Sequence, residues 1–258
     1  VTDGSSNGIL LRELAEAYAG RPAPPPLPLQ YADYAAWQRR WLDGARSRSQ
    51  LDWWQEQLAD VPPLLELPTD FARPAEQRFR GAWIWRSLDG EASARLRQFA
   101  GSRQATLYML LLAAFDLLLQ CYSGRDDIVV GTPVSARPQV EFEGLVGLFV
   151  NTLVLRTDLG GAPDFDSLLS RVRTTATAAF AHQDAAFERL VERLQPGRSL
   201  ARAPVFQVMF NLVPMPAEPL EAGDVSFRPG RLLDHGVSSF DLTLTVGEQA
   251  SGLELLFE

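Results

Sequence analysis

The amino-acid sequence predicts a mixed α/β sandwich, and three observations support this fold class. After residue 75, short runs of β-branched and aromatic residues alternate with segments whose apolar residues recur every three or four positions. Residues 107–119 are the most apolar run of the chain, although they contain Asp116, and they predict a buried core helix. Residues 146–156 form a β-type run that is apolar on both faces from Leu148 to Leu155, which predicts a central strand covered on both sides. Helices packed on a sheet satisfy all three patterns.

The first 75 residues predict helices joined by stiff connectors. A helix is expected over residues 9–18, with its N-cap supplied by Asp3, Ser5 or Ser6. Its expected apolar face consists of Leu10, Leu11, Leu14 and Tyr18.

Two more helices are expected over residues 31–41, where aromatic residues recur at helical steps, and over residues 47–58. The proline-rich residues 21–29 and 61–70 predict extended spacers. We expect a boundary between two lobes near residue 75.

The remaining chain predicts the elements of the sandwich. The expected strands are residues 79–88, 127–134, 146–156, 204–212, 224–229, 239–246 and 252–258. The expected helices run from Asp89 to Ala100, over residues 104–122, from Asp164 to Phe180, and from Asp184 to Leu194, with an aspartate as N-cap in the first, third and fourth.

Composition excludes several function classes. The chain has 258 residues, enough for one large domain or two small lobes, and 24 basic against 32 acidic residues give a net charge of −8. Arginine is scattered and no basic stripe exists, which argues against nucleic-acid binding. The most apolar run is shorter than the roughly 20 residues that a bilayer requires, so no membrane segment is expected.

Cysteine and histidine are scarce. The single cysteine, Cys121, excludes an internal disulfide and favours a reducing compartment, so we expect a cytoplasmic protein. Because Cys121 follows a leucine-rich segment, a buried structural thiol is expected. His182 and His235 leave too few ligands for a metal site, and we expect a loop anchor and a solvated side chain, respectively. No nucleophile elbow, P-loop or dinucleotide fingerprint occurs.

Asn151 is the unusual residue of its apolar run. A buried amide without a partner costs about 1–3 kcal/mol, so something must bond to it. One interpretation is a strand-end amide that ties down a neighbouring loop; the other is an amide that faces a substrate channel.

Five motifs, in order, make the chain resemble the condensation domain of non-ribosomal peptide synthetases. They are Asp3-Gly4, the tail of His-His-x-x-x-Asp-Gly; residues 31–37, Tyr-x-Asp-Tyr-Ala-x-Trp; residues 146–156, with Gly-x-Phe-Val-Asn-Thr at the centre; residues 182–191, His-Gln-Asp-x-Pro-Phe-Glu with Ala186 in place of proline; and residues 198–210. Residues 131–137 also resemble the family's loop near the lobe interface. Ser5 departs from the tryptophan that usually follows Asp-Gly.

The resemblance implies a chloramphenicol-acetyltransferase-like lobe. This lobe is a two-layer sandwich with a mixed β-sheet, here joined to a helical remnant of the partner lobe. Residues 1–75 would be the end of the N-terminal lobe with its connector helices, and residues 76–258 the C-terminal lobe, incomplete at its end. The motif histidines would precede Val1, so the isolated chain is expected to be inactive.

The resemblance also implies a reaction and partners. The family forms an amide bond between two thioesters held on carrier proteins by phosphopantetheine arms, and it binds no cofactor directly. The expected partners are the donor and acceptor carrier proteins, an adjacent adenylation domain and the missing N-terminal lobe. Epimerisation or heterocyclisation in the same fold, and a non-catalytic scaffold that docks carrier or adenylation domains, remain alternatives.

The resemblance also assigns site residues. Asp3 would be a structural acid paired with an arginine, and Gly4 would permit a tight turn; alternatively, Asp3 is a solvated terminus. The substrate channel would be lined or braced by Asn151, Phe149, Thr132 and Arg137. The face that would contact the missing N-terminal lobe is expected to be exposed and apolar, and to favour self-association of the chain.

Overall fold

The computed structural model describes residues 2–62, 64–137, 139–194, 200–215, 219–227 and 233–258. Its helices are α1 Gly4–Tyr18, α2 Tyr31–Leu42, α3 Ala45–Gln57, α4 Gly90–Ser102, α5 Leu107–Ser123, the 3-10 turn η1 Val140–Phe142, α6 Phe165–Ala181 and α7 Phe187–Leu194. Its strands are β1 Ile84–Asp89, β2 Asp127–Ser135, β3 Val150–Asp158, β4 Val208–Pro214, β5 Leu220–Ala222, β6 Val225–Phe227, β7 Leu242–Gln249 and β8 Gly252–Phe257.

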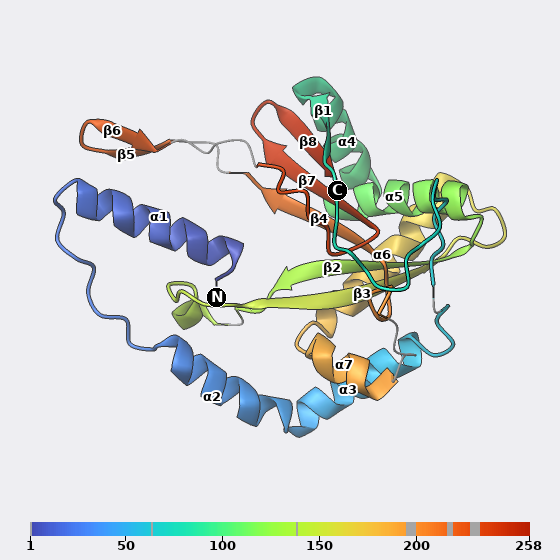
Figure 1. The fold of residues 1–258 in the computed structure, drawn as a ribbon, viewed down its shortest axis with the longest axis horizontal. Helices are drawn as coiled ribbons and strands as arrows, with labels where there is room; N and C mark the ends of the chain where they lie inside the picture. The colour runs from blue at the N-terminus through green and yellow to red at the C-terminus, as the bar shows by residue number, and fades with distance from the viewer. Residues whose placement is uncertain (1, 63, 138, 195–199, 216–218, 228–232) are drawn as a thin grey trace.

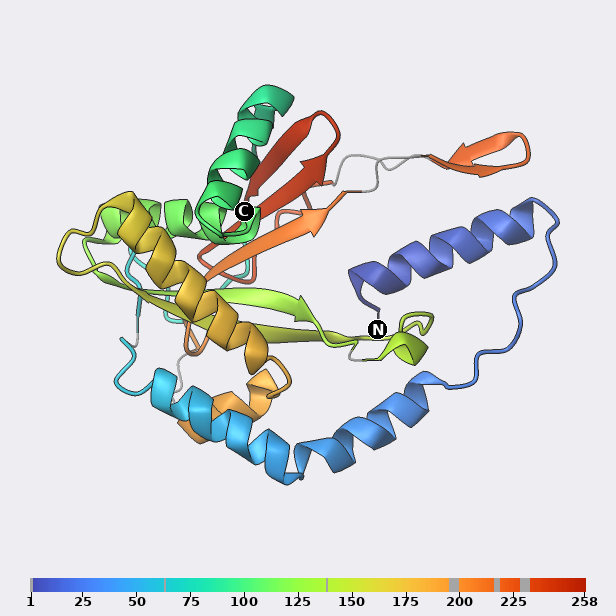
Figure 2. The same cartoon turned by 180° about the vertical axis from the view of Figure 1, so that it is seen from behind.

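A six-stranded mixed sheet forms the centre of the molecule. Its strand order is β1-β8-β7-β4-β2-β3, and β4 runs parallel to both of its neighbours while the other pairs are antiparallel. Figures 1 and 2 show α4, α5 and α6 on one face of this sheet. The mixed α/β sandwich predicted from the alternation of elements is therefore confirmed.

The position of β3 corrects one expectation. The run 146–156 was expected to be a central strand, but β3 lies at the edge of the sheet, and residues 146–149 precede it without strand structure. Helices α6 and α7 contact β3, and Leu153, Val154 and Leu155 are buried. Apolar residues on both faces of a strand indicate that other elements pack on both sides of the sheet. They do not indicate whether the strand has a paired strand on each edge.

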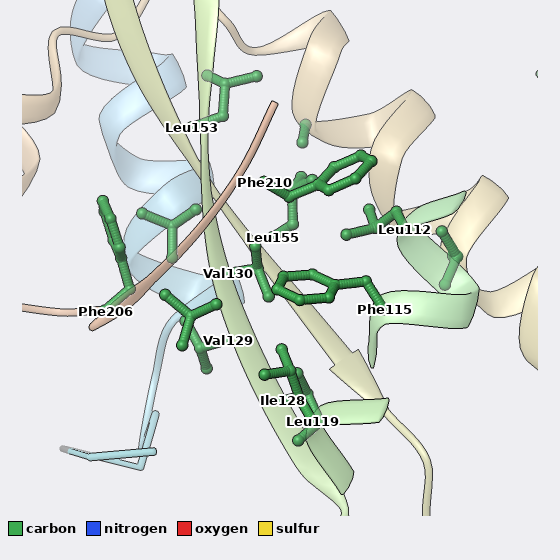
Figure 3. Packing of buried hydrophobic residues seen from close by; sticks show 14 of the residues in the cluster. Leu112, Phe115, Leu119, Ile128, Val129, Val130, Leu153, Leu155, Phe206 and Phe210 are labelled. Carbon is green, nitrogen blue, oxygen red and sulfur yellow. The ribbon is translucent and has the colours of Figure 1, made fainter. Parts of the chain in front are cut away.

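The main core lies between α5 and the sheet. Figure 3 shows Leu112 and Phe115 of α5 beside Val130 of β2, Leu155 of β3 and Phe210 of β4. The same cluster includes residues from before position 75, namely Leu51, Trp54, Leu58 and Leu65. The lobe boundary near residue 75 stays a prediction, and α3 packs into the core that lies beyond it.

Helix α1 exposes its predicted apolar face. Leu10, Leu11, Leu14 and Tyr18 are 44–58% exposed, whereas the buried residues of the helix are Ser6, Ile9 and Ala15. Figure 1 shows α1 standing apart from the six-stranded sheet, and its distal part contacts the β5–β6 hairpin. An apolar stripe predicts that a face can be buried but does not show what covers it.

Other differences are local. Cys121 is exposed on α5, so the expectation of a buried thiol was wrong. The strand expected from residue 79 begins at Ile84, and β5 was not predicted. Residues 198–199 of the last motif and 228–229 of an expected strand lie outside the described residues.

In the described part of the chain, no single helix is long and apolar enough to cross a membrane. Only α4 and α5 taken together reach that length and composition, and they meet at a bend of 99°.

Candidate active site

The first turn of α1 is attached to residues far along the chain. Asp3 is the N-cap of α1: its Oδ1 accepts a hydrogen bond from the Ser6 backbone N at 2.8 Å. Its Oδ2 accepts one from the Phe149 backbone N at 2.9 Å, and its own N donates to the Gly147 carbonyl at 3.1 Å. A cap residue thus joins the start of the chain to the segment just before β3.

Asp3 also forms a buried ion pair with Arg137. The Nη2 of Arg137 lies 3.1 Å from Asp3 Oδ1, and only 6% and 4% of the two side chains are exposed. The arginine partner expected for Asp3 is therefore present, and the solvated-terminus alternative was wrong. Burial raises the pKa of the Asp3 carboxyl, but hydrogen bonds from Ser6, Phe149 and Arg137 outweigh it, so the net shift is downward and Asp3 is ionised at neutral pH.

Both terminal nitrogens of Arg137 hold this region, while its buried Nε has no hydrogen-bond partner among the described residues. Its Nη1 donates to the carbonyls of Phe142 and Leu145, and its guanidinium lies 4.0 Å from the centre of the Phe149 ring. A desolvated cation over an aromatic face is attracted by the ring quadrupole. Arg137 thereby ties the loop around η1 to Asp3 and to Phe149.

Ser6 makes a third connection. Its Oγ donates to the Gly147 carbonyl at 2.8 Å and accepts from the Gly147 N and from Arg137 Nη2, each at 3.0 Å. We call Asp3, Ser6, Arg137, Gly147 and Phe149 the clamp.

An aromatic cluster from α2 packs against the clamp. Tyr34 lies 4.4 Å from Phe149 and 5.2 Å from Phe142, measured between ring centres. The Tyr31 hydroxyl donates to the Leu148 carbonyl, and its ring occupies the place where a Cβ on Gly147 would stand, 2.1 Å from Tyr31 Cδ2. Burial, with a smaller contribution from Tyr31, raises the pKa of Tyr34 to about 12. The aromatic stripe of α2 is packing, and it requires glycine at 147.

Asn151 bonds to the loop that precedes α7. Its Nδ2 donates to the carbonyls of Gln183 and Ala185 at 2.8 and 2.6 Å, and its Oδ1 accepts from the Phe187 N at 3.1 Å. This is the loop-tying interpretation of Asn151. Asp184 was expected to cap α7, but the helix begins three residues later, at Phe187, and Asp184 accepts from Gln50.

The two histidines stand outside the clamp. The His182 ring stacks on Trp53 at 3.9 Å, with Nδ1 2.8 Å from the Ala178 carbonyl, as expected of a loop anchor. His235 is exposed, and its ring lies 5.1 Å from Trp83. Among the described residues, no group of three or more His, Cys, Asp or Glu is placed to hold a metal ion.

The family model for the condensation domain matches residues 1–258, the whole chain. The chain belongs to the condensation-domain family.

Its relatives are large synthetases. The condensation-domain chain is 47% identical over 265 residues to a linear gramicidin synthase of Brevibacillus parabrevis, and 43% identical over 258 residues to malpinin synthetase of Mortierella alpina. The matched regions cover 100% and 98% of this chain, but the chain spans only 5% and 3% of those relatives' lengths.

Solved structures share its fold. The X-domain from teicoplanin biosynthesis superposes with a TM-score of 0.87 and 30% identity, over 99% of this chain and 61% of that one. A four-domain nonribosomal peptide synthetase bound to AMP and glycine gives a TM-score of 0.88 at 24% identity, over 99% of this chain and 20% of that one, and shows the fold alone. The likeness shows that the mixed sheet and its helices have the same fold as the matched part of these structures.

The structure brings the condensation motifs together, and the substrate-channel role expected for Asn151, Phe149, Thr132 and Arg137 stays a prediction. Phe149 and Thr132 are each 1% exposed, and 6% of the Arg137 side chain is exposed. These three side chains therefore line no open surface of this chain. Gly4 is the first residue of α1, without a positive φ, and a Cβ there would meet nothing within 4 Å; the expected tight turn at Gly4 is absent.

Sequence reasoning assigned no site role to two clamp residues. Ser6 was considered only as a helix cap, and Gly147 only as part of a motif. The available signal was the spacing of Asp3 and Ser6, which places both side chains on one turn of a capped helix.

Proposed function

We propose that this chain is part of a condensation domain that forms an amide bond between two carrier-bound aminoacyl or peptidyl thioesters. The clamp carries the proposal. It joins the tail of the first motif, at Asp3, to Arg137 and to the Gly147–Phe149 segment of another motif, although both lie more than 130 positions after Asp3. A structure that fixes these motifs against one another suits a reaction that depends on aligning two tethered substrates.

In this proposal the chain supplies one wall of the site. Asp3 is held ionised by its donors and moves no proton. Thr132, Phe149 and Arg137 brace the wall from behind, and Asn151 braces it by fixing the loop before α7. The catalytic imidazole belongs to a segment outside these 258 residues, since His182 and His235 stand apart from the clamp.

The implied partners follow from the reaction. Donor and acceptor carrier proteins would deliver phosphopantetheine arms, an adenylation domain would be adjacent in the same polypeptide, and the N-terminal lobe would complete the site. This chain would bind no cofactor itself. A cytoplasmic location is retained as a prediction from its single, unpaired Cys121.

An assay of amide formation tests the proposal. The complete condensation domain and the 258-residue chain are each mixed with a donor and an acceptor carrier protein loaded with aminoacyl thioesters, and the dipeptidyl thioester is quantified by mass spectrometry. We expect product from the complete domain and none from the chain alone. Turnover by the chain alone would contradict the assignment of the imidazole, and an inactive complete domain would contradict the function.

A second candidate is a docking module without turnover. One structural neighbour, at 32% identity and a TM-score of 0.87, was solved as a complex of the X-domain and OxyB from teicoplanin biosynthesis, so this fold can serve as a binding partner. Binding of a carrier protein or an adenylation domain to an inactive complete domain, measured by calorimetry, would favour this candidate.

A further inference from the structure

We infer that Ser6 is a positioning residue for the proposed condensation reaction: its hydroxyl fixes the direction of α1 and of the residues that precede α1 in the active site. The inference rests on the proposed function. It concerns the hydroxyl of Ser6, separately from the Asp3–Arg137 pair.

The first turn of α1 is held at two points. Asp3 is bonded through its backbone N to the Gly147 carbonyl and through its carboxylate to the Phe149 N. Ser6, one turn later, is bonded through its hydroxyl to both backbone groups of Gly147. One attachment fixes the position of a helix end but lets the helix pivot, whereas two attachments one turn apart also fix its direction.

Serine is suited to this place by its chemistry. A hydroxyl is both a donor and an acceptor, so one atom can satisfy the Gly147 N–H, one lone pair of the Gly147 carbonyl and an N–H of Arg137 together. The residue is 0% exposed, so no water replaces its oxygen if the hydroxyl is removed without a rearrangement. Ser5, its neighbour, is exposed and bonds to none of these groups.

The rest of α1 adds little restraint within the described residues. Its leucine face is exposed, and beyond the clamp its main contact is with the short β5 strand. The direction of α1 therefore depends on its first turn. A pivot there would move the groups just before Asp3, and displacement of a reacting group by about 1 Å can lower a rate by about 100-fold.

Kinetics of the complete condensation domain test this role. We would measure kcat and the KM for the loaded acceptor carrier in the wild type and in Ser6→Ala, Ser6→Cys and Ser5→Ala, at a temperature well below the melting temperature of each. We expect Ser6→Ala to lower kcat by about 10- to 100-fold with an unchanged KM. Ser6→Cys, whose thiol is a weak donor and acceptor, should give an intermediate kcat, and Ser5→Ala should match the wild type.

Each outcome decides the inference. A folded Ser6→Ala domain with wild-type kcat, or a kcat that falls only in proportion to the folded fraction, would overturn it and leave the proposed function intact. If Ser6→Ala does not fold, Ser6→Cys takes its place, and a wild-type kcat for that variant overturns the inference. An inactive wild-type domain would remove the proposed function and this inference together.

Discussion

The carboxyl group of Asp116 lies in the core on α5, where 1% of the residue is exposed and its Oδ2 has no hydrogen-bond partner within the described structure. Burial raises the pKa of Asp116 to about 8, and a hydrogen bond with Thr157 opposes the shift only in part. At neutral pH this acid is therefore mostly protonated in the folded protein. Because ionising a buried carboxyl is unfavourable, Asp116 lowers the stability of the folded protein more as the pH rises.

Asp116→Asn should make stability less dependent on pH. The pKa in the folded state lies above the ordinary 3.8. The contribution of Asp116 to the free energy of unfolding is therefore fully present below about pH 4 and is lost as the pH rises to about 8. We expect the free energy of unfolding of the variant to exceed that of the wild type by on the order of 2–5 kcal/mol at pH 8, and by much less at pH 4. Denaturant unfolding at both values measures the difference, and a difference that does not change with pH would contradict the expectation.

Arg137→Met should strongly destabilise the fold. Removing one partner of a buried ion pair leaves the other charge uncompensated and costs about 3–5 kcal/mol. The matched control is Arg95→Met, whose partner Glu91 is as exposed as itself and whose loss should cost less than about 1 kcal/mol. Chemical denaturation measures the loss in the free energy of unfolding for both variants. Similar losses would mean that the Asp3–Arg137 pair contributes no more to stability than an exposed ion pair.

At the scale of elements, caps show where local sequence is sufficient. The predicted N-caps Asp89 and Asp164 accept from the backbone N three residues later, as the spacing indicated. The predicted cap Asp184 does not, and Asn151 bonds the start of α7 from 36 positions away in the chain. Local spacing identifies partners within a turn, and a partner brought in by the sheet leaves no local signal.

Asn151→Ala should loosen α7 and leave the sheet intact. The variant removes the acceptor of the Phe187 N–H and both donors to the preceding loop, so we expect a cost of about 1–2 kcal/mol, as for loss of a helix cap. Hydrogen exchange should accelerate in Phe187–Leu194 and stay unchanged in β4. Asn7→Ala, at an exposed position of α1, is the control, and equal exchange in both variants would contradict the assigned role.

At the scale of the whole molecule, periodicity predicted the sandwich and most helices. It did not predict that β3 lies at the edge, or that the leucine face of α1 points away from the described core. Both facts depend on which element covers a surface. Phe149 and Arg137 were identified by motif, but their contact with each other and the bond of Arg137 to Asp3 are evident only in the structure.

The exposed face of α1 should make the 258-residue chain self-associate. Leu10, Leu11, Leu14 and Tyr18 are about half exposed along one helix, and a contiguous apolar patch beyond a few hundred Å² is unusual on a monomer. Leu14→Lys introduces a charge into the centre of this face and should lower the weight-average mass at a given concentration. Glu16→Gln changes the net charge by the same amount on the opposite side of the same helix, so this variant should associate like the wild type. Sedimentation velocity over a concentration series measures the wild type and both variants. A wild-type chain that stays a monodisperse monomer at high concentration would refute self-association through this face.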